Sequence, residues 1–125
     1  MSVKILLSIK PEFIEKIASG EKQYEFRKVE FKQEINEILV YATAPISQVV
    51  GKIKPQEILV DTPENLWEIV EKYSGISKKF YDEYYENKHQ AVAIKIKEYK
   101  SFKKYQRLSK YNVKVAPQSF VYLNN

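Results

Sequence analysis

A lysine, a glutamate and an arginine follow one another at short, fixed offsets near the start of this sequence. Lys22, Glu25 and Arg27 come directly after Gly20, where an amphipathic segment ends. If residues 24–27 are extended, Glu25 and Arg27 point to the same face of the strand. Such a set can bind a phosphate or a base edge, and it can also move a proton. The same spacing also suits a helix that ends at glycine, followed by a strand with a surface ion pair.

Each member of this set has a chemical role and a structural alternative. Lys22, if brought close to Arg27 in a cleft, would hold its proton less tightly and become a base or a nucleophile. On the surface it would stay a solvated cation. Glu25 would be ionised and would orient Lys22 or accept hydrogen bonds from a ligand, or it would simply neutralise Arg27. Arg27 offers a planar fork for phosphate or carboxylate, and it can equally lock Glu25 in position.

Apolar periodicity and turn residues divide the chain into strands and helices. Strands are predicted at residues 3–9, 24–29, 37–43, 49–60, 91–96 with an extension to 102, and 118–123. Helices are predicted at 11–19, 63–73 and 77–85, with a helical turn at 108–112. The segment 49–60 contains Pro55 and predicts either one long bent strand or two short ones, with the proline at an edge or a bulge.

Strands outnumber helices in this pattern, and the helices do not alternate regularly with them. The sequence therefore predicts the α+β class, with an antiparallel or mixed barrel flanked by two or three helices. The helix at 77–85 carries a stripe of Phe80, Tyr81, Tyr84 and Tyr85. A stripe at this spacing is typical of a helix face packed in a core.

The order Gly20, Lys22, Glu25, Arg27 matches the G-x-K-x-x-E-x-R motif of the ASCH domain family, which this sequence resembles. Residues 7–11, 40–45 and 116–120 also look like family segments, so the resemblance reaches both ends of the chain. It implies a small PUA-like β-barrel, a single domain over residues 1–125 and a link to RNA.

Five further residues are candidates for ligand binding. Ser8 and Lys10 stand where the first strand runs into the first helix, so free backbone N–H groups and a lysine could form an anion site there, or only a cap and a surface lysine. Tyr41 lies on a predicted core strand, one side of which is expected to face the barrel mouth. Gln118 and Ser119 belong to the family-like closing segment. An amide there could hydrogen-bond to a base edge, or it could only hydrogen-bond to backbone groups at the end of the strand.

Composition excludes several classes of site. The 125 residues contain no Cys and a single His, His89, so a disulfide framework, a thiolate metal site and a histidine cluster are excluded. We therefore expect no metal and no cofactor. No apolar run has the length of a membrane span, and no signal peptide is apparent, which predicts a soluble cytoplasmic protein without membrane contact.

Positive charge is concentrated in the C-terminal part of the chain. Residues 78–125 hold 11 of the 21 Lys and Arg but only 4 of the 16 Asp and Glu. Tyrosines interleave with these cations, as in surfaces that bind RNA or single strands. The alternative is a solvated lysine face over half-buried tyrosines. The candidate nucleic-acid surface consists of Lys95, Lys100, Lys103, Lys104 and Arg107.

These observations favour binding of RNA or a nucleotide-like ligand, with Lys22 and Arg27 supplying charge and Glu25 orienting the ligand. Catalysis is the main alternative, because the family resemblance also implies acetylcytidine amidohydrolases and enzymes that cut RNA. In the amidohydrolase members a threonine stands three positions after the motif lysine, where this chain has Glu25. Lys22 and Glu25 would be the catalytic pair if the chain is an enzyme. A third alternative is a regulatory module whose lysine-rich face contacts an acidic protein.

Overall fold

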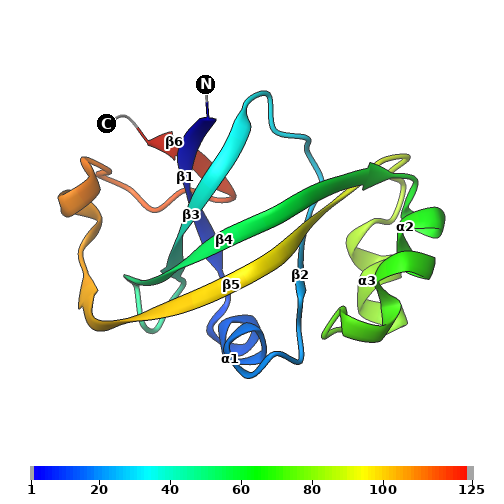
Figure 1. The fold of residues 1–125 in the computed structure, drawn as a ribbon, viewed down its shortest axis with the longest axis horizontal. Coiled ribbons are helices and arrows are strands. Elements are labelled where there is room, and N and C mark those ends of the chain that lie inside the picture. Colours follow the sequence, from blue (N-terminus) through cyan, green and yellow to red (C-terminus); the bar gives the residue numbers. More distant parts are fainter. Residues whose placement is uncertain (1, 124–125) are drawn as a thin grey trace.

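The computed structural model describes residues 2–123 as a curved mixed sheet with helices packed beside it (Figure 1). The strands are β1 (Ser2–Ile9), β2 (Tyr24–Arg27), β3 (Glu34–Ala42), β4 (Gln48–Asp61), β5 (Ala91–Gln106) and β6 (Phe120–Leu123). The helices are α1 (Pro11–Ser19), α2 (Pro63–Val70) and α3 (Lys78–Tyr84), with 3₁₀ turns η1 (Glu71–Tyr73) and η2 (Leu108–Tyr111). This architecture confirms the α+β class. Among these helices, none is long and apolar enough to span a membrane.

The strands are ordered β2-β5-β4-β3-β1-β6, with β1 and β3 parallel and the other neighbours antiparallel. The sheet is barrel-like but open, since β2 and β6 end this order and no ladder joins them within residues 2–123. The predicted barrel is therefore corrected to an open, barrel-like sheet. Both edge strands are short, with four residues each.

The segment around Pro55 forms one continuous strand, β4, of 14 residues. It runs antiparallel to β5, which has 16 residues and extends further than expected. The register shifts on both sides of Pro55. The proline therefore lies at an irregularity of the ladder, because it has no N–H to donate there. Of the two arrangements that the sequence allowed, the single bent strand is present.

Helix α1 ends shortly before the motif lysine, Lys22. It starts at Pro11, buries Ile14 and Ile17 against the sheet, and ends at Gly20, whose φ of +87° is left-handed. Glycine adopts this conformation without steric cost, so the chain can reverse there. The backbone N–H of Lys22 then donates to the Lys16 carbonyl at 3.0 Å, which places Lys22 beside the end of the helix, two residues before β2.

Helices α2 and α3 cover the part of the sheet where β4 ends and β5 begins (Figure 1). Both start at capped residues: Thr62 accepts a hydrogen bond from the backbone of Asn65, and Ser77 does the same for Phe80. The predicted aromatic core face is confirmed for Tyr81 and Tyr85, which are buried. It is wrong for Phe80, which is 39% exposed and lies against Phe13 of α1, outside that core.

Candidate functional site

A cleft of about 500 Å³ lies between β2, the end of β1 and the start of α3. Its lining comes from segments distant in sequence, and it includes both charged groups and aromatic rings. The lining residues are Ser8, Ile9, Lys10, Phe13, Lys22, Glu25, Phe26, Arg27, Lys28, Val29, Thr43, Ile76, Phe80, Tyr84, Gln118 and Ser119. The side chains of Lys22, Glu25 and Arg27 therefore share one cavity.

Lys22 is almost completely buried, with 2% of its surface exposed. Its Nζ donates to the carbonyl of Ser74 at 2.9 Å and lies 4.6 Å from the ring centre of Phe26 and 5.3 Å from that of Phe13. At Gly75, a Cβ would lie 2.4 Å from the Lys22 Cβ, so only glycine lets the backbone approach the lysine stem this closely. The loop before α3 thus fixes the lysine in place.

Burial lowers the pKa of Lys22 from 10.5 to about 8. Desolvation is the main cause, because the ammonium form loses its water in this site. The negative charge of Glu25 opposes the effect, whereas the positive charges of Lys16 and Arg27 add to it. Near neutral pH Lys22 is mostly a cation, and a minor neutral fraction is available as a base.

Glu25 and Arg27 form a buried ion pair, with Arg27 Nη2 2.8 Å from Glu25 Oε2. The same guanidinium donates to the Ser8 carbonyl at 2.8 Å and to the Ser119 hydroxyl at 3.2 Å. Arg27 therefore links the edge strand β2 to β1 and to the segment before β6, across the opening of the sheet. Its Nε is buried and has no hydrogen-bond partner among the described residues.

Ser8 and Lys10 line the cleft from the end of β1 and from the residue before α1. The Ser8 hydroxyl donates to the Pro117 carbonyl at 2.6 Å, and its backbone N–H donates to the Ser119 carbonyl at 3.0 Å. The hydroxyl proton is thus already engaged within the fold. Lys10 precedes α1 and its side chain is exposed, so it is an accessible cation at the cleft.

The structure brings most of the predicted ligand-binding residues together and leaves one apart. Ser8, Lys10, Gln118 and Ser119 line the cleft with the three motif residues. Tyr41 does not: it is buried with Leu6, Leu39 and Val49 in another cluster. The register shifts next to Tyr41 in the β3–β4 ladder, and Tyr41 packs in that core. Thr43, just beyond the end of β3, lines the cleft instead.

Sequence reasoning missed several residues of the cleft. The aromatic wall formed by Phe13, Phe26, Phe80 and Tyr84 was not predicted, although Phe26 lies inside the motif and Phe80 in the noted stripe. Tyr84 donates to the Phe26 carbonyl at 3.1 Å, and Lys28 Nζ lies 4.6 Å from the Tyr84 ring centre. Burial raises the pKa of Tyr84. No local signal pointed to the Ser74 carbonyl, because its role depends on a lysine 52 residues away.

The predicted nucleic-acid surface lies outside the cleft. Lys100, Lys103, Lys104 and Arg107 are exposed along the outer part of β5 and just after it, where the chain leads to η2 (Figure 1). Lys95 is half-buried and pairs with Tyr24 in the ladder with β2. None of these five lines the cleft. Residues 2–123 also contain no group of three or more His, Asp or Glu placed to hold a metal ion.

Comparison with known proteins gives relatives of two kinds. The large ribosomal subunit protein uL22 of Ureaplasma parvum is 35% identical over 103 residues, which are 82% of this chain and 33% of that protein. The ATP synthase subunit alpha of the same organism is 30% identical over 95% of this chain and 15% of its own length. The chain thus spans a third or less of these relatives. An ASCH domain-containing ribonuclease of Zymomonas mobilis is 28% identical over 75% of this chain and 64% of its own length.

Solved structures of an ASCH protein share the fold of this chain. The crystal structure of ASCH from Zymomonas mobilis superposes with a TM-score of 0.86 at 25% identity and covers 97% of this chain and 87% of its own. A mutant of that protein gives the same TM-score and identity. The sequence profile of the ASCH domain matches residues 7–100. Since that match spans well over half of the sequence, this chain belongs to the ASCH domain family.

Proposed function

We propose that this chain binds single-stranded RNA by holding one nucleotide in the cleft. The observation that carries the proposal is the joint lining of the cleft by cations and aromatic rings. Lys10, Lys22, Arg27 and Lys28 bring four positive charges, and Glu25 brings one negative charge. A nucleotide needs cations for its phosphate and flat apolar surfaces for its base.

The size of the cleft favours a single unpaired nucleotide. A cavity of about 500 Å³ is in the range of small-molecule sites and has no room for a duplex. Bases are accessible to such a cavity in single strands, loops and ends. Phe80 is 39% exposed and meets Phe13 edge to face, with ring centres 5.6 Å apart, so it offers a face on which a base can stack. The guanidinium of Arg27, which lines the cleft, supplies N–H donors for a phosphate or a base carbonyl.

Binding is tested with fluorescently labelled RNA pentamers of each base and a ten-base-pair RNA duplex, measured by fluorescence anisotropy. Phe80→Ala should weaken pentamer binding at least about fivefold, since loss of one stacking contact costs about 1–3 kcal/mol. Ile69→Ala is the matched control, because Ile69 is 59% exposed on α2 and does not line the cleft. Equal affinities of the two variants, or preference for the duplex, would contradict the proposal.

Cleavage of the bound RNA is a second candidate, favoured by the relative named as a ribonuclease and by the lowered pKa of Lys22. In such a reaction the neutral Lys22 amine takes the proton of a 2′-hydroxyl as its oxygen attacks the adjacent phosphorus. The bond to the 5′-oxygen breaks, and that oxygen takes up a proton from water. Arg27 and Lys10 would stabilise the charge on the phosphate oxygens.

The test for cleavage uses the same pentamers with and without a 2′-deoxy sugar, with products identified by mass spectrometry. Turnover should rise with pH toward a midpoint near 8, disappear with the 2′-deoxy sugar and disappear in Lys22→Met. Lys88→Met, at an exposed lysine outside the cleft, is the control. Cleavage that survives Lys22→Met would remove Lys22 from the mechanism, while binding without any turnover would leave the binding proposal standing alone.

A further inference from the structure

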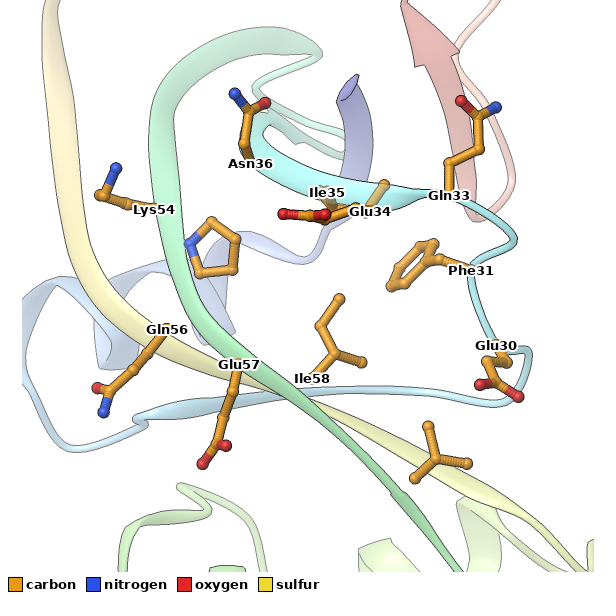
Figure 2. Close-up of a pocket in the computed structure, with 12 residues that line it drawn as sticks. Glu30, Phe31, Gln33, Glu34, Ile35, Asn36, Lys54, Gln56, Glu57 and Ile58 are labelled. Carbon is orange, nitrogen blue, oxygen red and sulfur yellow. The ribbon is translucent and has the colours of Figure 1, made fainter. Parts of the chain in front are cut away.

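A second hollow, of about 450 Å³, lies where β3 and β4 separate (Figure 2). It shares no lining residue with the cleft around Lys22. One wall comes from the start of β3 and the connection before it, and the other from the second half of β4. We call this hollow the β3–β4 groove.

The groove exists because the ladder between its two strands stops early. Pairing of β3 with β4 runs from Ala42 opposite Gln48 to Ile38 opposite Ile53 and then ends. Beyond that point, the residues of 54–61 in β4 that pair do so only with β5, and those of 34–37 in β3 that pair do so only with β1. Every second residue of a strand points its N–H and C=O away from a given neighbour. Both walls therefore present backbone groups to the groove that no strand within residues 2–123 pairs.

Part of the β4 edge is regular enough to accept another strand. Pro55 and the register shifts around it disrupt residues 54–56, as is common where an edge is protected. From Glu57 opposite Lys95 to Asp61 opposite Ala91, however, the ladder with β5 continues without a shift. These five residues form a regular free edge, and an extended segment can add to such an edge through main-chain hydrogen bonds.

The side chains around the groove define the chemistry of the segment that fits. Figure 2 shows Phe31 and Ile58 directed toward the middle of the groove from opposite walls, and both pack on the core beneath. Glu30, Glu34 and Glu57 lie on the rim. All three are exposed, and none of them forms an ion pair within the described part of the chain.

We propose that the β3–β4 groove binds an extended, basic segment of a partner protein. The segment adds as a strand along residues 57–61 of β4, its apolar side chains cover Phe31 and Ile58, and its Lys or Arg side chains meet the three glutamates. Lys54 is the only cation of the lining, so the groove is acidic although the whole chain carries a net charge of +5. Phosphate groups are repelled by this rim, which sets the groove apart from the proposed RNA cleft.

The probe is a fluorescent ten-residue peptide of alternating lysine and valine, with a glutamate–valine peptide as its control. The basic peptide should bind, and it should slow hydrogen exchange at alternate amides of residues 57–61. Glu34→Gln and Glu57→Gln should each weaken its binding about twofold to fivefold, as expected for exposed ion pairs. Glu68→Gln, at an exposed glutamate on α2, should leave its binding unchanged.

Four results would overturn this proposal: no binding of the basic peptide, equal binding of the acidic one, protection of amides elsewhere, or protection of residues 57–61 by an RNA pentamer. Protection that appears without peptide and grows with protein concentration would also overturn it, because the edge would then pair with a second copy of this chain. Methylation of alternate backbone nitrogens of the peptide should abolish binding if the added strand forms the main-chain ladder.

Discussion

Replacing Lys22 by Met tests whether the fold holds a titratable cation in a dry site. The pKa of Lys22 is lowered from 10.5 to about 8, with burial as the main cause. Between pH 8 and 10.5 the unfolded chain therefore keeps a proton that the folded protein has released. Stability rises with pH wherever the unfolded state binds more protons, so Lys22 makes the wild type more stable as the pH increases through this interval. The methionine variant lacks this contribution.

The magnitude follows from the size of the pKa change. One pKa unit corresponds to about 1.4 kcal/mol, so a change from 10.5 to about 8 corresponds to about 3 kcal/mol in all. Most of it, about 2.5 kcal/mol, should develop between pH 7 and 10. Burial raises the pKa of Tyr81 and Tyr85, which lowers stability above pH 10. Both proteins contain these tyrosines, so their effect cancels in the difference between wild type and variant.

The assay is urea unfolding of wild type and Lys22→Met at pH 7, 8, 9 and 10, monitored by the fluorescence of Trp67. The free energy of unfolding of the wild type, minus that of the variant, should increase by about 2.5 kcal/mol across the series. Lys88→Met, at an exposed lysine, should give a difference that does not change with pH. A constant difference for Lys22→Met would show that Lys22 titrates as it does in water, and it would refute the argument from burial.

Two further predictions concern the loop before α3 and the basic end of β5. Gly75→Ala should destabilise the protein by about 3 kcal/mol, because a left-handed φ and a clash with Lys22 add together, whereas Gly20→Ala, with open space around it, should cost about 1–2 kcal/mol. If thermal unfolding shows that the two variants lose the same stability, there is no clash between a side chain at position 75 and Lys22. Replacing Lys100, Lys103 and Lys104 together by Gln should flatten the salt dependence of RNA binding without changing the melting temperature. If RNA binding is unaltered, these lysines do not contact RNA and serve only to keep the protein soluble.

Local signals determined the limits of the first helix and the position of the motif strand. Pro11 has the fixed φ of a first helical residue, and Gly20 adopts the left-handed turn that ends the helix. Both effects act within a few residues, so they could be read without the fold. The offset of two between Glu25 and Arg27 similarly predicted a shared strand face, and in the structure they form an ion pair. The family match includes this segment and extends over residues 7–100.

Properties that depend on pairing between distant segments could not be read in this way. The sheet is open because no ladder joins β2 to β6 within residues 2–123, and sequence periodicity does not report which strands are neighbours. Tyr41 was expected at the barrel mouth, but the β3–β4 register places it in a core cluster. Phe80 was expected in the core, but it lies beside the cleft because α3 packs through Tyr81 and Tyr85.

The sequence by itself determined which chemical groups stand near one another along the chain: an amine, a carboxylate and a guanidinium within six residues. Only the tertiary structure decided how these groups behave. The Ser74 carbonyl and the backbone at Gly75 hold Lys22 from more than fifty positions away, and the ring centres of Phe13 and Phe26 lie 5.3 and 4.6 Å from its Nζ. A pKa depends on solvation and on the charges nearby in space. Those surroundings come from contacts between segments that the linear order leaves far apart.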